Sequence, residues 1–310
     1  MEVRELTSER REWSGLASRG TYFHTPEWLD AVGCEHFLIA EERAEIVGIL
    51  PITGGRRVFK EFASLPTPSL YGGALGSKEA QIALVRNAFE IGRKIASCTR
   101  LIYPPNTNPE FLFPFMDKEV RRTQILKLEG DYGKIYMGFE KERRYDVRKA
   151  PEDAKVEALK GKEINDFYKI YKETMGRLHA HPEPLCFFER VAVLNGCKLF
   201  GVKIGGELIG GGLFTFHGGT VTHLIGASKL EKRKEKPNVL LLNYVIEKGC
   251  MDGYERLDLG PSGEDKDLFR FKNGWGAEEA EYIVLEKAHT PLRRIQRSAI
   301  SVGRKIRGII

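Results

Sequence analysis

The stretch Lys198-Leu-Phe-Gly-Val-Lys-Ile-Gly-Gly-Glu-Leu-Ile-Gly-Gly-Gly-Leu213 decides the predicted fold. It reads as a strand, a two-glycine turn at Gly205-Gly206 and a second strand that opens with Glu-Leu-Ile-Gly. Two glycines between apolar runs favour a tight β-hairpin. The first half of the chain holds a similar stretch over Phe37–Leu50, whose second strand opens with Glu45-Ile-Val-Gly. Two such hairpins indicate an internal duplication.

Downstream of each hairpin, the chain repeats a helix followed by a short strand. In the first half, apolar residues at helical spacing predict a helix over Lys78–Ile95, followed by a strand at Arg100–Tyr103. In the second half, a strand at Leu224–Ser228 precedes a helix that begins near Pro237 and a strand over Arg256–Gly260. Proline is common at the first position of a helix. The sequence therefore predicts an α/β fold with a mixed (α+β) sheet in each of two similar halves.

The predicted boundary between the halves lies near Pro151, because this proline ends a charged helical stretch over residues 139–150. Beyond it we expect one strand and two helices, at residues 155–158, 162–175 and 185–195. The expected segments are an N-terminal domain over 1–150, a C-terminal domain over 151–289 and a separate helix over 290–310.

The net charge of +6 is concentrated at the C-terminus of the 310-residue chain. Residues 290–310 contain six cations and no acid, so residues 1–289 are formally neutral. Apolar side chains recur in this segment at steps of three and four, which predicts an amphipathic helix. Its apolar stripe comprises Leu292, Ile295, Ala299, Val302 and Ile306. We expect the stripe to pack on the body, with contact to a polyanion or an anionic membrane as the alternative.

The composition indicates an ordinary globular protein of the cytoplasm. The five cysteines include no C-x-x-C pair, so we expect reduced thiols. The N-terminus lacks the apolar region of a signal peptide, and no stretch is apolar enough for a transmembrane helix. We expect no metal site, because even His179 and His181 are better explained as a solvated loop pair.

Four stretches resemble the motifs of one enzyme family, in that family's order. They are Tyr22-Phe-His-Thr-Pro-Glu-Trp-Leu29, Arg144-Tyr-Asp-Val-Arg-Lys-Ala150, Leu224-Ile-Gly-Ala-Ser228 with the helix start Pro237–Leu242, and Phe271-Lys-Asn-Gly-Trp-Gly276. Together they resemble the FemAB/FemX-like branch of the GNAT superfamily, in which two GNAT-like domains are joined in one chain. The segment 160–199 has no room for the coiled-coil arm of longer members, which favours the short form.

This resemblance implies an acyltransferase that moves an aminoacyl or other acyl group onto an amine. It implies aminoacyl-tRNA as the donor in preference to acyl-CoA, with no permanently bound cofactor. The implied acceptor is a phosphate-bearing cell-wall precursor peptide or a similar amine, and no DNA partner is expected. Two alternatives stay open: an acyl-CoA or acyl-carrier N-acyltransferase, and a non-catalytic module that binds RNA or an anionic surface.

Aminolysis of an ester or thioester passes through an oxyanion, which needs a cation or an N–H donor. Lys272 is the first candidate for that cation, and the family motif places a functional Phe-Lys pair at Phe271 and Lys272. The alternative for Lys272 is a solvated lysine at a helix end. His223 stands where members often have a tyrosine, so it is a candidate proton relay, with a hydrogen-bonded strand histidine as the alternative.

Candidate substrate-binding residues surround this motif. Arg177 follows an apolar helix, where the family places an arginine that binds acceptor phosphate, although it can equally cap helix carbonyls. Arg144 and Arg148 share one face of a charged helix, which is either simply solvated or lines a groove between domains. Lys236 belongs to a basic loop before a helix, and Trp275 lies in the closing motif, where core packing is its alternative.

The loop that would bind CoA does not have the usual composition. Lys232-Arg-Lys-Glu-Lys-Pro-Asn238 is basic and precedes a helix, but it contains no glycine. Side chains can meet phosphates there, whereas a backbone cradle for a pyrophosphate is not expected. The first half has Gly72-Gly-Ala-Leu-Gly-Ser77 before its helix, which suits an anion better but needs no ligand.

Overall fold

The computed structural model describes residues 1–6, 13–34, 36–55, 61–63 and 68–295. The chain divides into two compact units, Met1–Arg121 with Tyr282–Ile310 (the first unit) and Arg122–Glu281 (the second unit). Residues 122–150 therefore group with the second unit, whereas the sequence predicts them in the N-terminal domain. The reason is that Phe139 and Val147 pack into the apolar core of the second unit.

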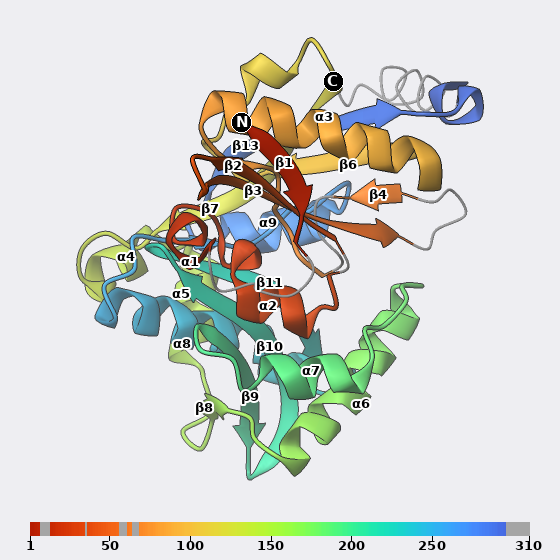
Figure 1. The fold of residues 1–310 in the computed structure, drawn as a ribbon. Helices are drawn as coiled ribbons and strands as arrows, with labels where there is room; N and C mark the ends of the chain where they lie inside the picture. The colour runs from red at the N-terminus through yellow and green to blue at the C-terminus, as the bar shows by residue number, and fades with distance from the viewer. Residues whose placement is uncertain (7–12, 35, 56–60, 64–67, 296–310) are drawn as a thin grey trace. The chain divides into compact units, whose positions relative to one another are not determined.

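The second unit is a mixed sheet with helices on both faces (Figure 1). Its strands pair in the order β7-β12-β11-β10-β9-β8, with β11 and β12 parallel. The elements along the chain are β7 (Asp117–Lys127), α4 (Tyr132–Gly138), α5 (Lys141–Arg148), β8 (Lys155–Ala158), α6 (Lys162–Arg177), α7 (Leu185–Val191), β9 (Cys197–Ile204), β10 (Glu207–His217), β11 (Thr220–Ser228), a 3-10 turn (Arg233–Glu235), α8 (Pro237–Met251), β12 (Arg256–Asp258), α9 (Lys266–Asn273) and β13 (Glu278–Ala288).

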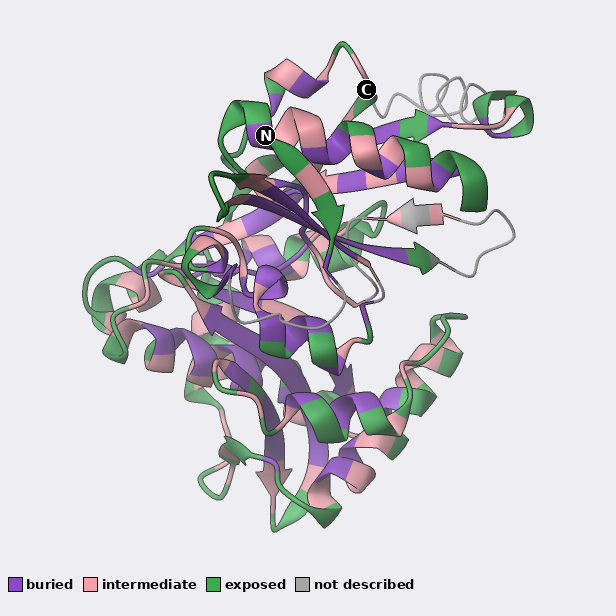
Figure 2. Ribbon diagram, viewed as in Figure 1, coloured by how far each residue is buried: buried purple, intermediate pink, exposed green. Residues whose placement is uncertain are grey.

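The predicted glycine hairpin lies within this sheet, between β11 and the edge strand β8. Gly205 and Gly206 have φ of 57° and 79°, which confirms the predicted tight turn between β9 and β10. In β10, a Cβ on Gly211 would lie 3.0 Å from Phe167 of α6. A Cβ on Gly212 would lie 2.6 Å from a carbonyl oxygen of β11 and 3.0 Å from Leu241 of α8. The glycines thus let α6 and α8 approach opposite faces of the sheet, and Figure 2 shows β9 and β10 buried along most of their length.

The first unit repeats part of this architecture. Its strands pair in the order β1-β2-β3-β4-β6-β13, β5 pairs with β3, and β4 and β6 are parallel. Leu84 of α3 packs with Leu38, Leu50 and Leu101 in the core. The elements are β1 (Glu2–Glu5), α1 (Ser14–Ala17), a 3-10 turn (Tyr22–His24), α2 (Pro26–Ala31), β2 (His36–Glu42), β3 (Glu45–Gly55), β4 (Glu61–Ala63), β5 (Leu75–Gly76), α3 (Lys78–Ile95), β6 (Cys98–Tyr103), a 3-10 turn (Glu110–Leu112) and parts of β7 and β13.

Most predicted elements are confirmed, but two long strands were missed. The predicted helix over 78–95 coincides with α3, the strand at 155–158 with β8 and the helix over 162–175 with most of α6. Strands β7 and β13 went unpredicted because charged residues crowd one end of each. The chain passes from one unit to the other within these two strands.

At the start of the basic C-terminal segment, a cation is buried and two apolar side chains are exposed, which is the reverse of the prediction. Residues 291–295 are helical. The Arg293 guanidinium donates to both carboxylate oxygens of Glu286, at 3.0 and 2.9 Å, and to Glu61 at 3.2 Å. Leu292 and Ile295 are 60% and 67% exposed, so the prediction that they lie on a buried stripe is wrong. The rest of the predicted stripe and of its cations, at residues 296–310, lies outside the described residues.

Candidate active site

The parallel strands β11 and β12 separate after a short paired stretch in the second unit. They pair only from Thr220–Arg256 to Thr222–Asp258. A bulge in β11 interrupts its pairing with β10, because Leu213 pairs with Ile225 and Phe214 with His223. His223 is therefore the first residue of β11 beyond the parallel pairing, and β12 continues from Asp258 into a turn. The predicted residues Lys272 and His223 both belong to this place.

Lys272 is buried, with only 5% of its surface exposed. It lies in α9, whose first turn is capped by the carboxylate of Asp265. Its Nζ donates to the carbonyl oxygens of Gly260 at 2.8 Å and Pro261 at 3.1 Å. Burial lowers the pKa of Lys272 to about 8, and the carboxylates of Asp258 and Asp265 oppose that shift. The alternative interpretation of a solvated lysine is thus wrong.

His223 is neutral at physiological pH. Burial, together with the nearby charge of Lys272, lowers its pKa to about 4. Its ring stacks on Phe214 at a centroid distance of 4.7 Å, and Nε2 lies 3.2 Å from the carbonyl oxygen of Ile225. Since a carbonyl only accepts hydrogen bonds, Nε2 carries the proton and Nδ1 is left as an acceptor. At pH 7 the site therefore combines an ammonium with a neutral imidazole.

The aromatic residues of the closing motif surround an arginine. The Arg143 guanidinium lies 4.6 Å from the ring centroid of Phe271 and 5.2 Å from that of Trp275. Trp275 is fully buried and makes an edge contact with Phe139 at 5.0 Å. In this structure Trp275 is a core residue, in line with its alternative interpretation, and a direct contact with substrate would need it to become exposed. Phe271 is half-buried and stays a candidate.

Two of the predicted substrate-binding arginines bind backbone carbonyls. Arg177 Nη2 donates to the carbonyl oxygen of Ser228 and to the hydroxyl of Thr174, both at 2.9 Å. Arg144 Nη1 donates to the carbonyl oxygens of Met137 and Phe139, both at 2.7 Å. Arg177 therefore ties the end of α6 to the end of β11. Whether either arginine also meets a substrate stays a prediction.

Exposed cations gather where α5 meets the loop before α8. Lys236 Nζ lies 3.3 Å from Asp146 of α5, which links the two elements. Lys229 and Lys232 pair with Glu207, and their hydrogen bonds lower its pKa to about 2. Four further cations are exposed and have no ion pair among the described residues. We call them the basic surface: Arg148, Lys149, Arg233 and Lys234.

The glycine-rich turn of the first unit is occupied by internal contacts. The Gly72 N–H donates to the carbonyl of Ile102, and the Ala74 N–H lies 3.3 Å from the hydroxyl of Tyr103. Ser77 caps α3 by accepting from Ala80. These contacts explain the turn without an anion.

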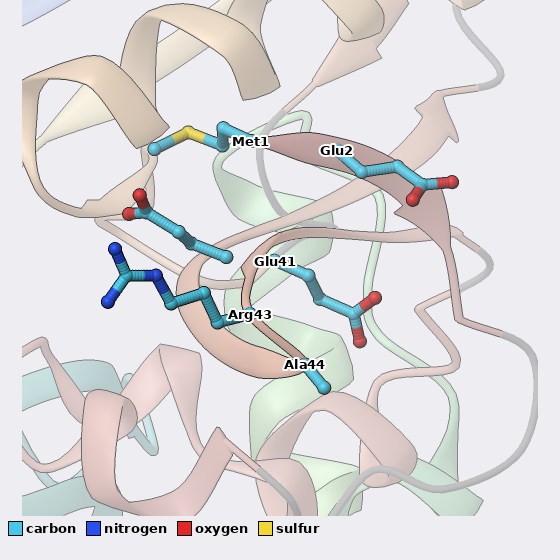
Figure 3. Close-up of a pocket in the computed structure, with 6 residues that line it drawn as sticks. Met1, Glu2, Glu41, Arg43 and Ala44 are labelled. Atoms are coloured by element: carbon cyan, nitrogen blue, oxygen red, sulfur yellow. The ribbon is translucent and has the colours of Figure 1, made fainter.

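A hollow of about 530 Å³ lies elsewhere in the first unit (Figure 3). Its lining comprises Met1, Glu2, Glu41, Glu42, Arg43 and Ala44. None of the predicted site residues borders it, and Glu41 is already paired with Arg4 at 2.7 Å. Among the described residues, no group of three or more His, Cys, Asp or Glu side chains is arranged to hold a metal ion.

Residues 139–273 match the family described as the acetyltransferase (GNAT) domain. This segment is similar to the GNAT family. It contains α5, the basic surface, the separating strands and Lys272. A search of curated proteins found no match. In the described part of the chain, no helix combines the length and the apolar character needed to cross a bilayer.

Solved structures extend the similarity to nearly the whole chain. The structure of FemX is similar with a TM-score of 0.69 and 14% identity, over 90% of this chain and 96% of FemX. L-PGS from Bacillus licheniformis is similar with a TM-score of 0.61 and 12% identity, over 96% of each chain. A tandem GNAT protein from the clavulanic acid biosynthesis pathway has a TM-score of 0.56 and 12% identity, over 94% of this chain and 99% of its own. At these identities the similarity concerns the fold, and it confirms the predicted tandem GNAT-like, FemX-like fold.

Proposed function

We propose that this protein transfers an aminoacyl group from aminoacyl-tRNA to an amine of a phosphate-bearing cell-wall precursor peptide or a similar acceptor. The observation that carries the proposal is the buried ammonium of Lys272 where β11 and β12 separate. An ammonium has three N–H donors, and the described residues accept from two of them. The GNAT domain supports the coarser part of the proposal, which is acyl transfer.

In the proposed reaction, the amine nitrogen attacks the carbonyl carbon of the aminoacyl ester. A C–N bond forms and the carbonyl oxygen becomes an oxyanion, to which Lys272 donates its third N–H. Collapse breaks the ester C–O bond, and the leaving hydroxyl oxygen gains the proton that the amine loses. Neutral His223 accepts a hydrogen bond from the amine at Nδ1. With a pKa of about 4, it orients the amine rather than holding its proton.

Two features of the loop before α8 favour tRNA over CoA as the donor. The backbone N–H groups of Lys232, Arg233, Glu235 and Lys236 all donate to carbonyls within the loop. They are therefore not free to cradle a pyrophosphate. The basic surface instead offers exposed side-chain cations, which suit an extended polyanion.

Transfer of a radiolabelled amino acid from charged tRNA to a phosphate-bearing cell-wall precursor peptide tests the proposal. Lys272→Met should lower kcat by about 10²–10³, the usual effect of removing one oxyanion donor. Lys266→Met makes the same change at an exposed position of α9 and should leave kcat unaltered. Circular dichroism checks that both variants fold. Full activity of Lys272→Met refutes the role of Lys272, and turnover with acetyl-CoA but not with charged tRNA refutes the donor.

A further inference from the structure

A buried carboxylate stands behind the carbonyl that binds Lys272. Asp258 is 3% exposed, and its Oδ1 accepts from the Thr123 hydroxyl at 2.6 Å and from the Gly260 N–H at 2.8 Å. The carbonyl of the same Gly260 accepts from Lys272 Nζ. A continuous path of hydrogen bonds therefore runs from Thr123 on β7, through Asp258 and the Gly260 residue, to the ammonium.

A second buried side chain on β7 fixes the other end of this turn. Gln124 Oε1 accepts from the Ser262 hydroxyl at 2.6 Å, and its Nε2 donates to the Phe269 carbonyl at 3.0 Å and to Asn273. Thr123 and Gln124 are each 1% exposed. Hydrogen bonds with Thr123 and Gln124 thus attach both ends of the turn over residues 258–262 to β7. The Gln124 amide also attaches α9, which carries Lys272, to β7.

We propose that Asp258, oriented by Thr123, is the positioning residue that sets both the location and the charge of the Lys272 ammonium. This inference rests on the proposed function. The charged and titratable groups that act on Lys272 are His223 from β11, Asp258 from β12 and Asp265 at the start of α9. Asp258 is the buried carboxylate among them, since Asp265 is exposed.

Asp258 acts on Lys272 through its negative charge rather than through its shape. The Thr123 hydroxyl and the Gly260 N–H both donate to Oδ1, and an asparagine oxygen accepts these hydrogen bonds equally well. A buried carboxylate between the core residues Leu257 and Leu259 is costly unless its charge is compensated. The Lys272 ammonium provides that compensation, and Asp258 in turn opposes the loss of the Lys272 proton that burial favours.

Asp258→Asn tests this role because it keeps the shape and an acceptor oxygen but removes the charge. The pH at which kcat falls on the alkaline side should move down by about one unit, as expected for losing a nearby opposite charge. At pH 8 this shift lowers the charged fraction of Lys272 from about one half to about one tenth, so kcat falls about fivefold. Asp267→Asn removes a carboxylate from the first turn of the same helix, where that side chain is 95% exposed. It should leave the profile unchanged.

Thr123 supplies the second comparison if Asp258→Asn does not fold. Thr123→Val removes the hydroxyl at constant volume and should lower kcat several-fold without raising KM, whereas Thr123→Ser should restore kcat.

Titration of labelled lysine by NMR measures the Lys272 pKa without any substrate. A downward shift in Asp258→Asn without turnover of the wild type would support the positioning role and refute the proposed function. An unchanged Lys272 titration in a folded Asp258→Asn variant, or equal activity of the Val and Ser variants, overturns the inference.

Discussion

The basic surface should dominate tRNA binding, and its contribution can be worked out from the structure. Arg148, Lys149, Arg233 and Lys234 are exposed and have no ion pair among the described residues. Each phosphate that a cation neutralises on a duplex adds about −0.9 to the slope of log K against log salt. Four such contacts therefore predict a slope of about −3.6 from this surface, or about a 150-fold loss of affinity between 50 and 200 mM salt.

The perturbation is replacement of all four cations by glutamine. Binding of fluorescently labelled tRNA, measured by anisotropy at several KCl concentrations, gives the slope directly. The quadruple variant should lose most of the slope, and each single variant should lose about 0.9. Lys232→Gln is the matched control, because Lys232 is in the same loop but is already paired with Glu207 at 2.9 Å. It should change the slope less than Arg233→Gln does.

Two results would refute this reasoning. If the quadruple variant keeps the full slope, the phosphates are bound elsewhere in the protein, and residues 290–310 with their six cations are then the next segment to test. If Lys232→Gln and Arg233→Gln have equal effects, pairing with Glu207 does not withdraw a cation from phosphate binding. The variants should all show the circular dichroism of the wild type, because the four cations of the basic surface are exposed and Lys232 is only partly buried.

Three further predictions concern stability and the C-terminal segment. Gly212→Ala should lower the free energy of unfolding by about 2 kcal/mol, because its Cβ would collide with the backbone of β11. Gly176→Ala should instead raise the free energy of unfolding by about 0.5–1 kcal/mol, because Gly176 lies in α6 and its added Cβ would meet open space. Urea unfolding measures both variants, and a Gly176→Ala protein less stable than Gly212→Ala would contradict the packing argument. Arg293→Met should cost about 3 kcal/mol because it leaves the buried Glu286 carboxylate without its main partner; a loss below about 1 kcal/mol in thermal unfolding would count against this. Truncation after Ile295 keeps that ion pair, so it should lower the melting temperature less than Arg293→Met does; binding to phosphatidylglycerol vesicles that the truncation leaves unaltered excludes the removed segment as a membrane contact.

The sequence by itself determined the elements whose signals are local. Gly205-Gly206 predicted the hairpin because positive φ at both residues is a property of the turn. The helix over 78–95 was found because its apolar spacing lies within one segment, and the structure adds a local cap in which the Ser77 side chain accepts from the Ala80 N–H. The ordered motifs around Arg144 and Lys272 then indicated a tandem GNAT-like fold, which the comparisons confirm.

Only the tertiary structure decided what surrounds Lys272. Its burial, and hence its pKa of about 8, arises from α9 packing beside the turn after β12. The Thr123–Asp258 hydrogen bond joins residues 135 positions apart. Strand β7 was not predicted because the charged residues in its first half obscure the apolar pattern of its buried second half. Arg293 is a second example. The basic composition of residues 290–310 suggested an exposed cation, but its hydrogen bonds to Glu286 place Arg293 in the interior. A charge becomes functional through its desolvation and its partners, and both are set by long-range packing that no local pattern records.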